Sequence, residues 1–134
     1  MEIINLSETN TILNKFVQEL RDVQVQKDSL RFRRNIERIG EIMAYEISKQ
    51  FRYSPKSIQT PLGTALVNTP DDPLVISTIL RAGLPFHQGF LRYLDNAENA
   101  FVSAYRKYKD RLNFDIHIEY IASPRLTNKT LIIT

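Results

Sequence analysis

Two stretches near the start of the chain repeat apolar residues at the spacing of an amphipathic helix. The first covers about residues 10–21, and Thr9 or Asn10 is predicted to cap it. The second covers about residues 29–51, with Asp28 or Ser29 as the predicted cap. The apolar positions are Ile12, Leu13, Phe16, Val17 and Leu20 in the first stretch, and Phe32, Ile36, Ile39, Met43 and Ile47 in the second. We therefore predict two N-terminal helices that turn these stripes towards the core.

Short β-prone segments and turn residues follow the helices. Two such segments flank residues 61–63, Pro-Leu-Gly, which predicts a β-hairpin. After a turn rich in Asp and Pro, the apolar run Leu74–Leu80 predicts a buried strand. Residues 85–94 predict a helix with a proline in its first turn, and residues 100–105 predict the next strand. A strand, a helix and a strand in this order form a βαβ unit, so the two strands should be parallel.

The last two predicted strands differ in pattern. The segment Phe114–Ala122, "FDIHIEYIA", alternates apolar and polar residues, which is typical of a half-buried strand near a sheet edge. Residues 130–134, "TLIIT", are apolar on both faces, which is typical of a central parallel strand. The pattern predicts one α/β domain with a helical segment at 1–56, a hairpin arm at 57–69 and the start of an α/β core at 70–134.

The composition narrows the class of protein. The chain has 134 residues, enough for one domain, and its 43% hydrophobic content is typical of a globular protein. With no cysteine, it has no disulfide, no cysteine-ligated zinc and no cysteine nucleophile. The net charge of +3 fits an anionic partner but is only weak support for nucleic acid. No apolar run is as long as a membrane span and the start lacks a signal peptide, so we expect a cytoplasmic protein without a membrane partner.

A cation directly follows the most apolar predicted strand. Arg81 comes after Leu74–Leu80, and Ala82 and Gly83 separate it from the next helix. Open α/β sheets bind ligands at the carboxyl ends of their strands, and the N–H groups of a helix N-terminus attract anions. We therefore predict that Arg81, Ala82 and Gly83 form a phosphate cradle, in which Gly83 allows the backbone to approach the ligand closely. The alternative is a tight turn whose arginine points into solvent.

A second arginine, Arg106, is predicted to lie just past the end of the neighbouring strand. Because the two strands are expected to be parallel, Arg81 and Arg106 should converge on one crevice that holds two phosphates. The alternative for Arg106 is the start of a solvated loop. Asp71 and Asp72 precede their strand and are predicted to be turn residues, and His87 is predicted to have a packing or surface role. No residue is assigned as a catalytic group or as a metal ligand.

Five segments of the chain resemble uracil phosphoribosyltransferases. They are "ELRD", "RFRRNIERIGEIMAYE", "TPLG", "ILRAGLPFHQGFL" and "AFVSAYR", and they occur in order along nearly the whole chain. The resemblance implies a type I phosphoribosyltransferase fold, in which a parallel sheet is joined by N-terminal helices and a β-hairpin arm. It also implies transfer of ribose 5-phosphate from phosphoribosyl diphosphate to N1 of uracil, with magnesium, giving UMP and diphosphate in pyrimidine salvage.

The resemblance gives the two arginines a role. It implies that Arg81 belongs to the loop that holds the diphosphate and that Arg106 also contacts phosphoribosyl diphosphate. Negative charge grows on the departing diphosphate as its bond to the sugar breaks through an oxocarbenium-like state. A fixed arginine therefore stabilises the transition state more than the ground state. The family also implies a homo-oligomer.

The resemblance stops at residues 130–134. In the family, the matching strand is followed by the loop that cradles the ribose 5-phosphate, and a later segment recognises uracil. We therefore expect the N-terminal portion of a longer enzyme, incomplete at its C-terminus and inactive alone. The rival hypothesis is a non-catalytic regulator on the same fold that binds nucleotide or RNA. The segment "RFRR" suggests RNA, but Phe32 is predicted to face the core, and the pair Arg81 and Arg106 favours the enzyme.

Overall fold

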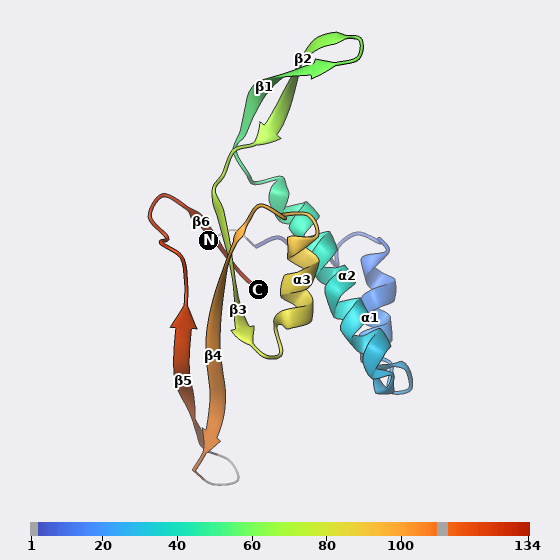
Figure 1. Ribbon diagram of the computed structural model, residues 1–134. Coiled ribbons are helices and arrows are strands. Elements are labelled where there is room, and N and C mark those ends of the chain that lie inside the picture. The colour runs from blue at the N-terminus through green and yellow to red at the C-terminus, as the bar shows by residue number, and fades with distance from the viewer. Residues whose placement is uncertain (1–2, 110–112) are drawn as a thin grey trace.

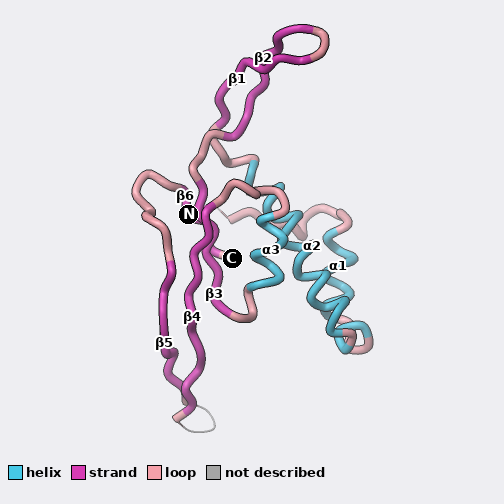
Figure 2. The backbone as a smooth tube through the Cα atoms, viewed as in Figure 1, coloured by secondary structure: helices cyan, strands magenta, loops and turns pink. Residues whose placement is uncertain are grey.

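The computed structural model describes residues 3–109 and 113–134. Its helices are α1 (Leu13–Arg21), α2 (Ser29–Ser48) and α3 (Leu84–Leu91), with a short 3-10 helix, η1 (Val25–Lys27), between the first two. Its strands are β1 (Tyr53–Thr60), β2 (Gly63–Pro70), β3 (Leu74–Leu80), β4 (Glu98–Tyr108), β5 (Phe114–Ala122) and β6 (Thr130–Ile133). The three α-helices gather on one side of the sheet, and the β1–β2 hairpin extends away from both (Figures 1 and 2).

Strands β3 to β6 form one sheet in the order β5-β4-β3-β6. β3 is parallel to β4 and to β6, whereas β4 is antiparallel to β5. Because α3 connects β3 to the parallel β4, the predicted βαβ unit and the α/β class are confirmed. The edge position of β5 is also confirmed, but the prediction that this strand is half-buried is wrong, because all of its residues are exposed and the helices cover the sheet at β3 and not at this edge.

The last strand, β6, is parallel to β3 as predicted, and in the described part of the chain it pairs with β3 alone. The central position predicted for this strand stays a prediction. Only Ile132 of this strand is buried, while Leu131 is 42% exposed and Ile133 is 74% exposed. Apolar residues on both faces of a strand indicate that both faces can be buried. They do not show which strand pairs with its second edge.

The hydrophobic core lies between the sheet and the helices. Ile76 of β3 and Ile132 of β6 pack there with Phe90 of α3, Ala44 of α2 and Ala97. Side chains alternate along a strand, so the neighbours of these core residues point to the other face of the sheet. That face is open at Ile79 and Ile133, which are 54% and 74% exposed. The helices cover the face that carries Ile76, and the opposite face is open at these two positions although Val75 on it is fully buried.

The starts of the two N-terminal helices show one correct and one wrong prediction. Asp28 caps α2, because its carboxylate accepts hydrogen bonds from the N–H groups of Leu30 and Arg31 at 3.1 and 3.0 Å. α1 begins at Leu13, later than predicted, and neither Thr9 nor Asn10 caps it. The capping position is Ile12, which has no side-chain cap, and the hydroxyl of Thr11 accepts a hydrogen bond from the N–H of Leu13 at 3.2 Å.

The buried face of α2 differs from the predicted apolar stripe. Its buried residues are Asn35, Glu37, Gly40 and Ala44, whereas Phe32 and Met43 are 39% and 38% exposed. The expectation that Phe32 faces the core is therefore wrong. α2 lies between α1 and α3, and small residues let α3 approach closely, so the tightest contact falls beside the stripe and not on it.

The predicted hairpin is present, and it begins at Tyr53, before the expected boundary at residue 57. β1 and β2 are antiparallel, with Thr60 opposite Gly63 across the turn. Gly63 has a φ of 130°, a conformation that requires glycine. At the base of the hairpin, the carboxylate of Asp72 accepts hydrogen bonds from the backbone N–H of Arg52 at 2.6 Å and from its Nε at 2.8 Å. This places Asp72 in a structural role, as predicted.

Candidate functional site

The junction between β3 and α3 presents an arginine at a strand end. β3 ends at Leu80, the peptide bond to Arg81 is cis, and α3 begins at Leu84 with Pro85 in its first turn. The side chain of Arg81 is exposed and makes no hydrogen bond or ion pair with any residue that the structure describes. Its guanidinium group is therefore available to an anionic ligand at the carboxyl end of β3.

The backbone of the predicted cradle offers fewer donors than expected. The N–H group of Gly83 donates to the carbonyl of Ile79 at 3.1 Å, and that of Leu84 donates to the carbonyl of Arg81 at 3.3 Å. Both groups are engaged within the turn. Of the three predicted cradle residues, only Arg81 and Ala82 remain as backbone donors for a ligand.

Gly83 has a reason to be glycine that sequence reasoning missed. Its φ of −72° is accessible to any residue, so its backbone conformation does not require glycine. However, a Cβ atom at this position would overlap the hydroxyl of Thr78 and would lie 3.0 Å from the carbonyl oxygen of Ile79. The missing side chain thus makes room for Thr78, whereas close approach to a ligand remains a prediction. Thr78 itself is buried, and its only signal in the sequence is a hydroxyl inside an apolar run.

Arg106 lies within a strand and not past its end, so that part of the prediction is wrong. β4 continues to Tyr108, and Arg106 pairs in register with Ile116 of β5. Its guanidinium carbon is 4.8 Å from the ring centroid of Phe114, a cation–π contact. The antiparallel partner β5 explains the difference, because it extends β4 beyond the region that pairs with β3 (Figure 1).

The two arginines share one edge of the sheet but are not brought into contact. Leu80, the last residue of β3, is opposite Ser103, so Arg106 lies three positions further along β4. At roughly 3.3 Å per residue, this offset corresponds to about 10 Å. The β4–β5 pairing also has an irregularity between Ser103 and Ala104, which separates Arg106 from the part of β4 that pairs with β3. Any ligand of both arginines therefore has to extend along the sheet edge.

The described acidic and histidine residues near these arginines are engaged in other contacts. Asp115 forms an ion pair with Lys109 at 2.7 Å, and the ring of His117 packs on Tyr105 at 5.2 Å. His87 is buried, and its Nε2 lies 2.6 Å from Oδ1 of Asn99, so its packing role is confirmed. Among the described residues, no three acidic or histidine side chains are grouped in a way that could hold a metal ion.

The arginines of "RFRR" are largely engaged in ion pairs. Arg31 lies 3.6 Å from Glu19, and Arg34 lies 2.7 Å from the buried Glu37. Hydrogen bonding from Asn35 contributes most to lowering the pKa of Glu19, and the charge of Arg31 adds to the effect. Two of the three arginines of this segment therefore have acidic partners within α1 and α2, and binding of RNA stays a prediction.

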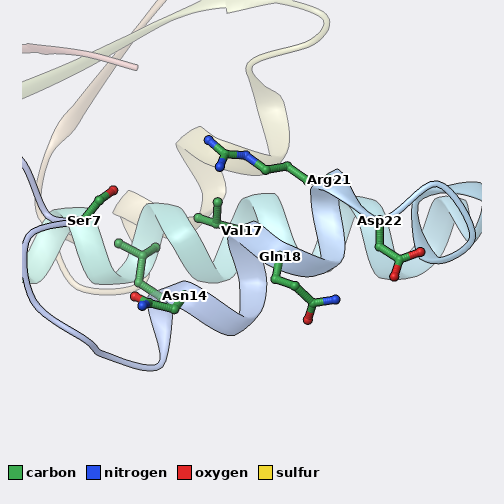
Figure 3. Close-up of a pocket in the computed structure, with 7 residues that line it drawn as sticks. Ser7, Asn14, Val17, Gln18, Arg21 and Asp22 are labelled. Carbon is green, nitrogen blue, oxygen red and sulfur yellow. The ribbon is translucent and has the colours of Figure 1, made fainter.

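A separate hollow of about 540 Å³ lies along α1, away from the strand ends (Figure 3). It is lined by Ser7, Leu13, Asn14, Val17, Gln18, Arg21 and Asp22. The carboxylate of Asp22 already accepts the N–H groups of Gln24 and Val25 at 2.8 and 3.2 Å. Neither Arg81 nor Arg106 lines this hollow, so it is not part of the candidate site at the strand ends.

The comparison with known proteins identifies similar sequences over the whole chain. The family model described as uracil phosphoribosyltransferase matches residues 7–133. A protein of that name from Porphyromonas gingivalis is 65% identical over 134 residues, which are 100% of this chain and 62% of that protein. Another from Methanothermobacter thermautotrophicus is 38% identical over 108 residues, which are 79% of this chain and 49% of that protein. The chain thus spans only 49–62% of the length of these two curated relatives.

A solved structure has the same arrangement of elements. The AQ2163 protein from Aquifex aeolicus superposes with a TM-score of 0.78 at 26% sequence identity, and the match covers 93% of this chain and 58% of that one. Across the residues that the structure describes, no helix combines the length and the hydropathy of a transmembrane span.

Proposed function

The chain belongs to the uracil phosphoribosyltransferase family, and from this premise we propose that it serves the transfer of ribose 5-phosphate from phosphoribosyl diphosphate to uracil. In this reaction a bond forms between N1 of uracil and C1 of the ribose. The bond between C1 and the diphosphate oxygen breaks, the diphosphate leaves with the electron pair, and N1 loses its proton. The products are UMP and diphosphate.

The observation that carries this proposal is the unpaired Arg81 at the carboxyl end of β3. No described residue neutralises its guanidinium group, so the full charge is available to the departing diphosphate. The turn that holds Arg81 is fixed by the hydrogen bonds of Gly83 and Leu84 described above. A preorganised cation of this kind stabilises the charge that develops in the transition state without reorganising during the reaction.

Arg106 contributes to binding the same substrate. Its contact with Phe114 holds the guanidinium group beside the β4–β5 ribbon, further along the sheet edge than Arg81. Phosphoribosyl diphosphate carries phosphates at both ends of its sugar, so it is long enough to contact Arg81 and Arg106 at the same time. In this arrangement Arg106 orients the substrate, and orientation supplies a large part of the rate gain in a transfer between two bound molecules.

Magnesium is the cofactor proposed from the family, but the described residues do not provide a site for it. They contain no group of three acidic or histidine side chains. Mg²⁺ commonly keeps several water ligands and binds through substrate phosphates with few protein carboxylates. We therefore assign the ion to the diphosphate of the substrate and derive no step of the reaction from it.

We also propose that the protein is a cytoplasmic homo-oligomer in which the β1–β2 hairpin contacts another subunit. The hairpin stands away from the rest of the chain, and its apolar residues Leu62 and Leu66 are 101% and 76% exposed. A two-stranded hairpin is marginally stable in water unless something covers it.

An assay of UMP formation tests the proposed function. The intact natural protein is incubated with uracil, phosphoribosyl diphosphate and magnesium, and UMP and diphosphate are quantified. We expect both products in equal amounts. Residues 1–134 alone are expected to form no UMP. Arg81 and Arg106 bind the phosphates, and this binding by itself cannot orient C1 of the ribose against uracil. The proposal is wrong if the intact protein releases no UMP while it remains folded.

A further inference from the structure

A single buried side chain, that of Thr78 in β3, contacts two neighbouring strand ends. Thr78 is fully buried, with 0% exposure. Its hydroxyl donates a hydrogen bond to the carbonyl oxygen of Thr134, after β6, at 3.2 Å. The same hydroxyl lies against Gly83, where a Cβ atom would overlap it. Thr78 is therefore in contact with the turn that carries Arg81 and with the segment that follows the parallel strand β6.

Thr134, the residue after β6, is held closely against β3. The N–H group of Thr134 donates to the carbonyl oxygen of Ser77 at 2.8 Å, and the hydroxyl of Thr134 donates to the same oxygen at 3.0 Å. With the bond from Thr78, three hydrogen bonds join Thr134 to two consecutive residues of β3. These bonds fix the position of Thr134 relative to β3.

The turn after β3 is equally restricted. The N–H group of Gly83 donates to the carbonyl of Ile79 at 3.1 Å, which closes the turn over the end of the strand. The space below Gly83 is filled by the hydroxyl of Thr78, so the turn cannot move closer to the sheet. The volume and position of this hydroxyl therefore set how far the turn stands from the sheet.

We propose that Thr78 is a positioning residue for the substrate site, because it fixes the spacing between the Arg81 turn and the carboxyl end of β6. This inference rests on the proposed function and adds a residue to it. Ligands of open α/β sheets bind across the carboxyl ends of adjacent strands, and β3 and β6 are adjacent and parallel. A substrate with phosphates at both ends of a sugar spans such neighbouring ends, so a change in their spacing misaligns it.

Two variants at this position separate the hydroxyl group from the rest of the side chain. Thr78→Val replaces the hydroxyl by a methyl group, which is larger and presses against the Gly83 turn, and it removes the hydrogen bond to Thr134. Thr78→Ser keeps the hydroxyl and loses only a methyl group. The matched control is Thr69→Val in β2, because the buried hydroxyl of Thr69 has no hydrogen-bond partner among the described residues and lies in the hairpin.

The kinetic measurement uses the intact protein. We expect Thr78→Val to raise KM for phosphoribosyl diphosphate about tenfold, the scale of one buried hydrogen bond, with a smaller change in KM for uracil. Thr78→Ser and Thr69→Val should stay within about threefold of the unsubstituted protein. A merely structural role would instead lower the melting temperature and affect both substrates equally. An unchanged KM for phosphoribosyl diphosphate in Thr78→Val would overturn the proposal.

Amide hydrogen exchange tests the same contact without any assay of activity. Thr78→Val should accelerate exchange at both Gly83 and Thr134, whereas Thr69→Val should leave both rates unchanged. If neither rate changes in Thr78→Val, the proposal is wrong even where the protein forms UMP. A third outcome separates this proposal from the proposed function. If both rates rise but the unsubstituted protein neither binds phosphoribosyl diphosphate nor forms UMP, the proposed function is wrong. Thr78 would then link the two strand ends without positioning that substrate, so the proposal would be wrong as well.

Discussion

Gly40 of α2 and Gly89 of α3 face each other where the two helices cross. A Cβ atom at Gly40 would lie 3.2 Å from the Cα of Gly89 and 2.5 Å from the carbonyl oxygen of Phe86. A Cβ atom at Gly89 would lie 2.9 Å from the Cα of Gly40 and would overlap the carbonyl of Glu37. The backbones of the two helices are therefore in direct contact, and this contact fixes the axis of α3, whose N-terminus follows the Arg81 turn.

Substitution of Gly89 by alanine is expected to destabilise the protein. The methyl group meets backbone atoms that cannot rotate away, so the helices must separate, at a cost of about 1–3 kcal/mol in the free energy of unfolding. Chemical denaturation of Gly89→Ala, with the exposed Gln88→Ala as control on the same helix, measures this cost. Equal stability of Gly89→Ala and the unsubstituted protein would show that the helices do not approach as closely as described.

Glu37 supports the same helix pair through ion pairs. Its carboxylate lies 2.5 Å from Nη2 of Arg92 and 2.7 Å from Nη1 of Arg34, and the residue is buried. Burial raises the pKa of the Glu37 carboxyl, but hydrogen bonds and charges from Arg92 and Arg34 together outweigh burial and hold the pKa below its ordinary value of 4.5.

The direction of this pKa shift predicts a pH dependence of stability. A carboxyl group whose pKa is lowered in the folded state stabilises the fold above its unfolded pKa, and that contribution is lost as the pH falls through the folded pKa. Glu37→Gln should therefore lower the free energy of unfolding at pH 7 and flatten its decline below pH 4.5. Denaturation from pH 7 to pH 3 measures both effects, with the exposed Glu119→Gln as control. A decline as steep in Glu37→Gln as in the unsubstituted protein would contradict the assignment.

The β1–β2 hairpin is expected to mediate subunit contact. Leu66 is 76% exposed in the described chain, and a charge at this position should oppose its burial against a partner. Leu66→Asp should therefore shift the intact protein to a smaller species in analytical ultracentrifugation. The control is Tyr93→Asp, at an exposed apolar residue outside the hairpin. Assembly of Leu66→Asp identical to that of the unsubstituted protein would remove the hairpin from the interface.

The elements of the fold were predictable because local patterns determine them. Asp28 has both the right chemistry and the right place before a long apolar repeat, and it caps α2. The wrong predictions concern tertiary contacts. Nothing in the spacing of apolar residues shows that Gly40 and Gly89 bring two helices into backbone contact, and this contact decides which face of α2 is buried.

Part of the candidate site was also predictable, because a local pattern in the sequence determines it. Arg81 stands where an apolar strand ends, which the sequence shows directly. The place of Arg106 depends on how far β5 extends β4, and the role of Thr78 depends on a contact with Thr134, 56 residues further along the chain. Such long-range pairings leave no local pattern, so one sequence alone does not reveal them.

Substitution of Arg106 should affect one substrate more than the other. Arg106 lies on the β4–β5 ribbon, held by Phe114, and no described contact connects it with a second ligand site. Arg106→Ala should therefore weaken phosphoribosyl diphosphate binding about tenfold or more, the scale of one charge-assisted contact, and leave uracil affinity nearly unchanged. Isothermal titration with each ligand separately measures the two affinities. A greater loss for uracil than for phosphoribosyl diphosphate would refute the assignment.

The most direct test of the central claim, that Arg81 stabilises the departing diphosphate, is the steady-state kcat for UMP formation by Arg81→Ala in the intact protein. We expect kcat to fall by about two to three powers of ten, the scale of losing one preorganised donor. Arg81→Lys should also be impaired, because a point charge does not reproduce the planar fork of a guanidinium group. Arg125→Ala, at an exposed arginine between β5 and β6, is the matched control and should keep its kcat. A near-normal kcat in a folded Arg81→Ala variant would contradict the claim and exclude Arg81 from the site.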